Sequence, residues 1–194
     1  MMKSVKKLIT IFTSAFISLF ALFIFLLFVI WHFVLDLPDH EQLINYEPPM
    51  VTRVYASNGR LISEYAAEQR SFVPIESVPK IVINSILVAE DKNFYNHIGI
   101  DFTGIIRAAK RNLNNIGGRP EGASTITQQV AKNFFLSREV SYKRKIKEVL
   151  LALRIEQILD KDRILELYLN QIYLGFRSYG VAAASLNYFN KSLN

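Results

Sequence analysis

An uncharged apolar run near the N-terminus, Leu8 to Leu35, constrains this chain more than any other feature of its sequence. The run contains no Asp, Glu, Lys or Arg, and its 28 residues would extend about 42 Å as a helix. The hydrocarbon core of a bilayer is about 30 Å thick, so the run can cross it with some tilt. A cleaved signal peptide has an apolar region of only ~7–15 residues, and no small-x-small cleavage site precedes Asp36. We therefore expect residues 8–35 to form a transmembrane anchor.

The charges on the two sides of this run predict its orientation. Three lysines lie within residues 1–7, whereas Asp36 and Asp39 follow the run. Positive charge marks the cytoplasmic side of a membrane segment. Residues 1–7 are therefore expected to be a cytoplasmic basic tail, and the rest of the chain is expected to be extracytoplasmic.

The composition of the extracytoplasmic part excludes some classes of function. From Asp36 onward, 20 Lys and Arg face 17 Asp and Glu, which leaves a net charge of only +3. This balance is not typical of a protein that binds nucleic acid. The chain has no Cys, so disulfides and thiolate metal sites are excluded and the fold depends on packing.

Residues 36–76 are predicted to form a linker with a β-hairpin. The proline-rich segment from Leu37 to Met50 is expected to be extended at the membrane surface. Two apolar-rich runs, Val51 to Tyr55 and Leu61 to Tyr65, then flank an Asn58-Gly59 pair. Asn-Gly between such runs is a strong hairpin signal.

From residue 77 onward the apolar residues recur at helical spacing, which predicts a mainly α domain over residues 77–194. The last pattern ends without a visible cap or partner helix. We therefore expect the C-terminal end of this domain to be incomplete and the chain to be part of a longer one. The expected helices are Val78 to Glu90, Phe102 to Asn114, Thr125 to Phe135, Ser141 to Leu159, Lys161 to Leu174 and Gly180 to Asn190.

A first polar stretch follows the apolar run from Ile81 to Ala89. Glu90 and Asp91 come directly after this run, and His97 follows. Apolar neighbours would raise the pKa of Glu90 toward a value useful to a general base; the alternative is a solvated carboxylate at a helix end. His97 is more typical of a structural hydrogen bond, and metal ligation is not expected because the other histidines lie in or near the anchor.

A second polar stretch begins at Thr125. Thr125 and Gln128 fit a capping box, which predicts a helix whose positive end and free N–H groups suit a phosphate. Thr125, Gln129 and Lys132 would share one face of this helix. The adjoining apolar stripe would consist of Ile126, Val130 and Phe134.

A basic segment follows, with six basic residues and one acidic residue between Lys132 and Lys147. A solvated or lipid-facing patch is one interpretation. On a helix, however, Glu148 lies one turn from both Arg144 and Lys145, so an ion-paired cluster is expected there.

These three segments, followed by Ile164 to Gly175 and Gly180 to Phe189, resemble in order the five motifs of the peptidoglycan glycosyltransferases, glycosyltransferase family 51. The resemblance extends from Glu90 to about Lys191. It implies a lysozyme-like helical domain that polymerises lipid II into β-1,4-linked glycan strands and releases polyprenyl diphosphate. Tyr46 to Pro49 and the hairpin segment also resemble the linker of class A penicillin-binding proteins. We therefore expect a truncated N-terminal part of such a protein, with any transpeptidase domain in the longer chain.

The resemblance implies roles for individual residues. Glu90 would be the general base that takes the proton from the acceptor sugar 4-hydroxyl, and Glu148 would aid the departure of the diphosphate. Asn170 would hold a loop in place. A divalent cation, Mg²⁺ or Mn²⁺, would accompany the diphosphate, but the sequence assigns no ligands to it. The expected substrate-binding residues are Asp91, Phe94, His97, Thr125, Gln129, Lys132, Asn133, Arg144 and Lys145.

The resemblance also implies location and partners. The chain would sit in the bacterial inner membrane as a single-pass protein, with its catalytic domain in the periplasm. Its partners would be lipid II, the growing glycan strand, membrane lipid and other cell-wall synthesis proteins, but no nucleic acid.

Two alternatives stay open at this point. A glycan hydrolase or lytic enzyme on the same lysozyme-like fold would also use a glutamate at a helix end, although it needs no diphosphate clamp. An inactive, truncated membrane scaffold would carry the same residues without turnover.

Overall fold

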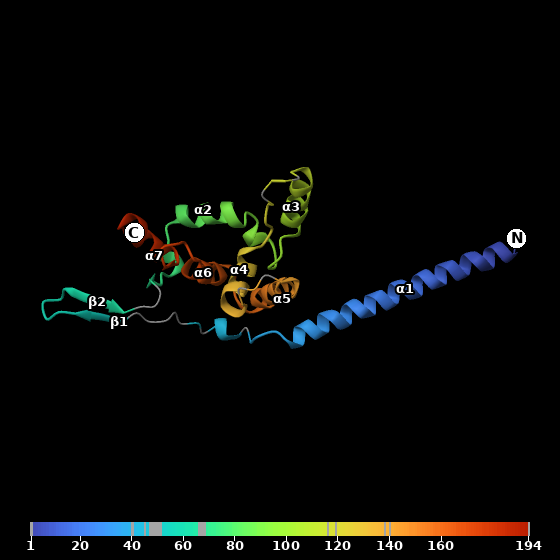
Figure 1. Ribbon diagram of the computed structural model, residues 1–194, viewed down its shortest axis with the longest axis horizontal. Coiled ribbons are helices and arrows are strands. Elements are labelled where there is room, and N and C mark those ends of the chain that lie inside the picture. The colour runs from blue at the N-terminus through green and yellow to red at the C-terminus, as the bar shows by residue number, and fades with distance from the viewer. Residues whose placement is uncertain are drawn as a thin grey trace. The chain divides into compact units, whose positions relative to one another are not determined.

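The computed structural model describes residues 2–39, 41–44, 46, 52–65, 69–115, 117–118, 120–137, 139 and 141–193. The chain divides into two compact units, Met1–Pro38 and Asp39–Asn194, and each is described by itself (Figure 1).

The first unit is one long helix, α1 (Met2–Leu35). Its part from Ile11 to Leu35 has the length and composition needed to cross a membrane, and no other helix in the described ranges meets this test. Large apolar side chains such as Phe12 and Phe16 are exposed on this helix. The predicted anchor segment is thus a continuous apolar helix.

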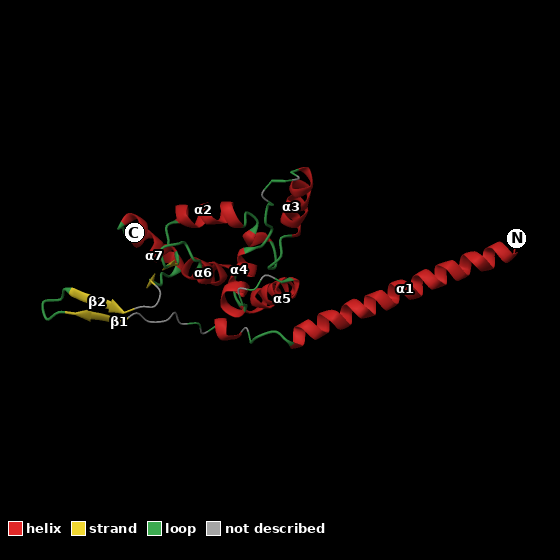
Figure 2. Cartoon of the chain, in the orientation of Figure 1, coloured by secondary structure: helices red, strands yellow, loops and turns green. Residues whose placement is uncertain are grey.

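The second unit begins with the predicted hairpin. Strands β1 (Thr52–Tyr55) and β2 (Leu61–Tyr65) pair antiparallel, as Figure 2 shows. Gly59 has a φ of 79°, and the Asn58 side chain accepts a hydrogen bond from the Arg60 N–H at 3.1 Å. The Asn-Gly pair therefore makes the turn as expected, because Gly adopts positive φ without steric cost.

The rest of the second unit is mainly helical, which confirms the predicted fold class. Short 3-10 turns, η2 (Ile75–Ser77) and η3 (Phe94–Asn96), flank the first helix of the domain. The α-helices are α2 (Lys80–Glu90), α3 (Phe102–Asn114), α4 (Ile126–Phe135), α5 (Tyr142–Ile158), α6 (Lys161–Gln171) and α7 (Val181–Phe189).

The core of this domain lies where α4, α5 and α6 pack together. Each of these helices begins at a side-chain cap, Thr125, Ser141 or Asp160, which accepts a backbone N–H of the first turn. Helix α6 is buried on every side between Ile164 and Leu169.

Helix α6 ends at Gln171 and not at Leu174, so the predicted end was wrong by three residues. Beyond it, Tyr173 bridges to Tyr179, and the Gly180 N–H donates to the Ile172 carbonyl at 2.8 Å. Gly180 has a φ of 86°, and a Cβ there would lie 2.8 Å from the Asn170 carbonyl oxygen. This close return of the chain, which only glycine permits, replaces the last helical turn.

A segment at the end of the linker, from Val73 to Ile75, is hydrogen-bonded to α6, and we call it the strap. The Asn170 side chain accepts from the Val73 N–H at 2.8 Å and donates to the Val73 carbonyl at 2.8 Å, so it holds a loop as expected. The Glu166 carboxylate accepts from the Ile75 N–H at 2.9 Å. Just before this segment, β3 (Gln69–Arg70) pairs parallel with β4 (Ser178–Tyr179), a contact that the sequence did not predict.

The segment after the anchor is not simply extended, contrary to expectation. Residues Glu41–Leu43 form a 3-10 turn, η1, and Leu43 is only 1% exposed. The Tyr46 carbonyl accepts from Arg163 at 3.3 Å, and the Tyr46 ring packs edge-on against Phe134. Burial of Leu43 favours this turn over an extended chain. Residues 40, 45 and 47–51 lie outside the described residues.

Replacement of Asn170 by aspartate tests the strap. The new carboxylate would keep an acceptor for the Val73 N–H but would place an oxygen against the carbonyl oxygens of Val73 and Glu166. We expect Asn170→Asp to cost about 1–3 kcal/mol of stability and to speed amide hydrogen exchange at Val73 and Ile75. The same change at the exposed Asn84 is the control. Unchanged exchange at both amides in Asn170→Asp would contradict the strap.

Candidate active site

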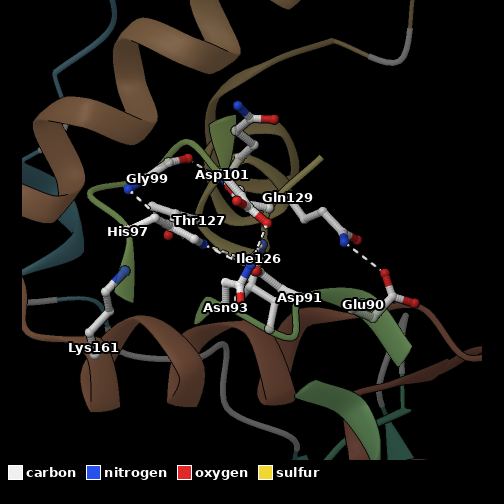
Figure 3. A network of polar contacts seen from close by, with 12 residues as sticks. Glu90, Asp91, Asn93, His97, Gly99, Asp101, Ile126, Thr127, Gln129 and Lys161 are labelled. Carbon is white, nitrogen blue, oxygen red and sulfur yellow. Dashed lines mark hydrogen bonds and ion pairs between the residues drawn. The ribbon is translucent and has the colours of Figure 1, made fainter. Parts of the chain in front are cut away.

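Glu90 is the last residue of α2, and it is exposed. Its Oε2 accepts a hydrogen bond from the Gln129 side-chain Nε2 at 2.8 Å, which Figure 3 shows. Contrary to expectation, the apolar neighbours of Glu90 do not desolvate it, because the end of α2 is not covered and Val88 is 61% exposed. The structure therefore presents Glu90 to solvent and orients it with an amide donor from α4.

Glu90 lines an open cleft of about 390 Å³. The cleft also contains three cationic side chains that the sequence analysis missed, Lys92, Arg107 and Arg111. Arg107 and Arg111 lie one turn apart on α3, and this spacing on a helix rich in basic residues was the available signal. The full lining is Val88, Ala89, Glu90, Asp91, Lys92, Arg107, Arg111, Glu121, Gly122, Ser124 and Gln129.

Glu121 is the acidic member of this group of charges. Its Oε2 lies 2.7 Å from the Arg111 Nη1, and its Oε1 lies 3.9 Å from the Arg107 Nε. The Asn112 side chain binds the Glu121 backbone at both its N–H and its carbonyl. The cleft wall formed by α3 and the loop before α4 thus carries an excess of positive charge.

Asp91 lies beside Glu90 but is buried, and it joins two segments (Figure 3). Its carboxylate accepts from the His97 Nε2 at 3.0 Å and from the Ile126 N–H at the start of α4 at 3.0 Å. The Gly99 N–H donates to the His97 Nδ1 at 3.1 Å, so we assign the ring proton to Nε2. His97 therefore connects the Asp91 carboxylate to the Gly99 backbone as a neutral ring, which is the structural role that one interpretation of the sequence predicted.

The expected phosphate site at the start of α4 is wrong. The Asp91 carboxylate already occupies this helix end, where a negative charge is favoured. Thr125 is buried; its hydroxyl donates to the Gly99 carbonyl at 2.7 Å and accepts the Gln128 N–H, so the predicted cap is confirmed. Asp91 and Thr125 support the site, because their polar atoms are engaged inside the protein.

Phe94 is also part of the support, since it is only 1% exposed and cannot contact a substrate in this arrangement. The Lys161 Nζ lies 4.5 Å from the centre of its ring. Lys161 pairs with Glu156 at 2.7 Å, and Glu156 accepts from the Thr127 hydroxyl at 2.6 Å. Through these contacts, the segment that contains Phe94 is held against α6, and α6 is held to α5 and α4.

Glu148 is buried within the basic segment and forms the expected ion pairs. Its Oε1 lies 3.0 Å from the Arg144 Nε, and its Oε2 lies 2.9 Å from the Lys145 Nζ. Lys145 also donates to the Ser124 Oγ at 2.8 Å and to the Gln128 Oε1 at 3.2 Å. Because Ser124 lines the cleft, this cluster reaches the rim of the cleft that contains Glu90.

Helix α4 connects the two carboxylates through neighbouring residues. Gln129 binds Glu90, and Gln128 binds Lys145, which in turn holds Glu148. This explains the paired glutamines of the second polar stretch. Farther along α4, Lys132 is half-buried and Asn133 is exposed.

The side chains in the described part of the chain do not form a preassembled metal site. These residues contain no group of three or more His, Asp or Glu side chains arranged to hold a metal ion. Both oxygens of Glu148 are engaged by cations. We therefore assign no step to a protein-bound metal.

Removal of the Asp91 carboxylate tests whether Asp91 stabilises the fold around the site. Asp91→Ala leaves two buried donors, the Ile126 N–H and the His97 Nε2–H, without an acceptor, at a cost of about 1–3 kcal/mol each. We expect a clear fall in the midpoint of thermal unfolding, followed by circular dichroism. Asp162→Ala, which removes an exposed carboxylate that accepts from Tyr95, should cost less. Equal effects of the two changes would count against a supporting role for Asp91.

Comparison with known proteins agrees with this arrangement. Residues 58–194 match the family model described as Transglycosylase. The chain is 55% identical to penicillin-binding protein 1A of Rickettsia typhi over 92% of this chain and 24% of that protein. It is 58% identical to that of Rickettsia prowazekii (86% and 21%) and 50% identical to that of Neisseria gonorrhoeae (81% and 20%). The chain thus spans a quarter or less of the length of these relatives. Because the family model matches well over half of its residues, the chain belongs to the transglycosylase family.

Proposed function

We propose that the chain is a peptidoglycan glycosyltransferase that acts in cell-wall synthesis. It would polymerise lipid II into β-1,4-linked glycan strands and release polyprenyl diphosphate. The observation that carries this proposal is the link through α4 between an exposed carboxylate, Glu90, and the cationic cluster around the buried Glu148. Such a pair of sites suits a reaction that needs a base at one end and an anion clamp at the other.

In the proposed reaction Glu90 is the general base. It takes the proton from the acceptor sugar 4-hydroxyl, whose oxygen attacks the anomeric carbon of the donor and inverts it. The bond between that carbon and the diphosphate oxygen breaks, and the electron pair leaves with the diphosphate. The Gln129 amide holds the Glu90 carboxylate for this proton transfer.

Arg144 and Lys145 are the proposed clamp for the leaving diphosphate. Preorganised positive charge stabilises the negative charge that develops as the bond breaks. Glu148 lies between these two side chains and holds them in place, so its effect on departure would be indirect. Lys132, on the same helix as Gln129, would add a further positive charge.

The cations of the cleft separate this proposal from the hydrolase alternative. Hydrolysis of a glycosidic bond in glycan creates no diphosphate, so it gains nothing from such charges. Lys92, Arg107 and Arg111 line the same cleft as Glu90, where they would attract an anionic, diphosphate-bearing substrate.

The apolar helix α1 fits a substrate with a lipid tail. The N-terminus would lie in the cytoplasm, and the catalytic domain would lie at the periplasmic face of the bacterial inner membrane. Membrane lipid and other cell-wall synthesis proteins are proposed partners. A divalent cation stays a prediction, which chelation in the polymerisation assay tests.

Replacement of Glu90 by Gln tests the base. Glu90→Gln should lower the rate of lipid II polymerisation by about 10²- to 10⁴-fold, because the amide cannot accept the proton. The measurement is glycan polymer on a gel, with circular dichroism to check folding. Glu76→Gln, at an exposed carboxylate in η2, is the matched control. Near-native polymerisation by Glu90→Gln would remove the central assignment, cleavage of existing glycan would favour the hydrolase, and a folded native chain without activity would favour the scaffold.

Neutralisation of Lys145 tests the clamp. Lys145→Gln should raise the KM for lipid II about 10- to 100-fold, since it removes a charge-assisted hydrogen bond to the diphosphate. Lys143→Gln, two residues away and exposed, should change the KM little. An unchanged KM in a folded Lys145→Gln chain would exclude Lys145 from the clamp.

A further inference from the structure

Glu121 lies in the loop before α4 and pairs with both arginines of the cleft wall. Its Oε2 accepts a charge-assisted hydrogen bond from the Arg111 Nη1 at 2.7 Å. Its Oε1 lies 3.9 Å from the Arg107 Nε, which is too long for a hydrogen bond. The proposed reaction gives Glu121 no role, although its carboxylate lies among the cations of the cleft.

The charge of this wall depends on Glu121. Arg107 and Arg111 carry two positive charges, and the Glu121 carboxylate cancels one of them. Without this carboxylate the wall would keep both charges, in the same cleft as the further cation Lys92. Positive charge along a cleft attracts anions. Glu121 therefore lowers the affinity of the wall for any anion that enters the cleft.

The side chain of Glu121 is held weakly, whereas its backbone is held firmly. The Arg111 and Arg107 side chains are 68% and 47% exposed, and an ion pair in such contact with water contributes little to stability. The Asn112 side chain, by contrast, accepts from the Glu121 N–H at 2.8 Å and donates to the Glu121 carbonyl at 3.1 Å. The carboxylate can therefore leave the arginines while the loop stays in place.

The loop that carries Glu121 also reaches the proposed diphosphate clamp. Ser124, three residues after Glu121, accepts a hydrogen bond from the Lys145 Nζ at 2.8 Å. At Gly122, between them, an added Cβ would meet no atom within 4 Å, so this stretch of the loop borders open space. The cleft volume of about 390 Å³ is in the range of sites for small molecules. A short loop thus connects two groups of cations beside a cleft with room for an anion.

We propose that Glu121 is an internal counter-ion, which occupies a diphosphate subsite at Arg107 and Arg111 and is displaced when the diphosphate of the lipid-linked substrate binds there. A guanidinium binds carboxylate and phosphate oxygens in the same fork geometry, so Glu121 takes the place of the ligand in the resting structure. The inference rests on the proposed function, because that function supplies a diphosphate. The subsite on α3 would be separate from the clamp at Arg144 and Lys145.

An internal counter-ion selects ligands by their charge. Glu121 is tethered beside the arginines, so its effective concentration is high, and a ligand with a single negative charge gains nothing by replacing it. A diphosphate carries more charge and more acceptor oxygens, so it gains contacts to both guanidiniums. Glu121 would thus keep carboxylates and other singly charged anions out of the subsite.

The test is a titration of the full chain with inorganic diphosphate, followed by NMR of the arginine side-chain Nε–H signals. Arg107→Lys and Arg111→Lys identify the two signals, so binding at the clamp on α5 does not interfere. We expect both signals to shift in the native chain. In Glu121→Gln the midpoint of the titration should fall about 2- to 5-fold, because the ligand no longer competes with an exposed ion pair. Acetate should shift the signals in Glu121→Gln more than in the native chain.

Two further variants serve as controls. Glu139→Gln removes the same charge from an exposed carboxylate of the basic segment, so it should leave the midpoint at the α3 arginines unchanged. Glu121→Asp keeps the charge but shortens the side chain, so its midpoint should lie between those of the native chain and Glu121→Gln. Thermal unfolding should have nearly the same midpoint in these variants, because the ion pairs of Glu121 are exposed.

The outcomes separate this inference from the proposed function. An identical diphosphate midpoint in the native chain and Glu121→Gln overturns the displacement, and so does the absence of a shift at Arg107 and Arg111. A lower midpoint with an unchanged KM for lipid II in Glu121→Gln overturns the substrate assignment, because the subsite would then take free diphosphate. A lower midpoint with a lower KM supports the inference. The titration needs no turnover, so a lower midpoint in a chain that makes no polymer supports the counter-ion and counts against the proposed function alone.

Discussion

The candidate site depends on one buried contact, the Asp91 carboxylate at the N-terminus of α4. This carboxylate accepts the Ile126 N–H and the proton of His97, while His97 accepts the Gly99 N–H. The three hydrogen bonds lock the segment after α2 against the start of α4. A buried charge is costly unless it is paired, so these partners must be in place for the segment to fold. These hydrogen bonds also fix the position of Glu90, the residue before Asp91.

The same contact explains why α4 organises the chemistry. Once its first turn is fixed at Asp91, the next residues along the helix extend to both carboxylates of the site. Gln129 reaches Glu90, and Gln128 reaches Lys145 beside Glu148. Buried polar networks of this kind are strongly coupled, because each member leaves another unsatisfied if it is removed. The site is thus built as a unit across α2, α4 and α5.

Much of the fold follows from local patterns in the sequence. Apolar spacing and capping residues predicted the helices of the second unit to within a few residues, and Asn58-Gly59 predicted the hairpin. The end of α6 was mispredicted because a distant contact, the return of the chain at Gly180, competes with the helix. The buried turn at Leu43 and the pairing of β3 with β4 were missed for the same reason.

The sequence by itself determined several of the chemical groups that the site contains: the Glu90 carboxylate, the paired glutamines and the ion cluster within one helix from Arg144 to Glu148. These depend on residue type and on spacing along one element, which a sequence records directly. Only the tertiary structure decided their roles. It buried Asp91, Phe94 and Thr125 as supports, left Glu90 exposed, and brought Arg107 and Arg111 of α3 into the cleft. Burial and contacts between separate elements come from packing in three dimensions, so local patterns do not reveal them.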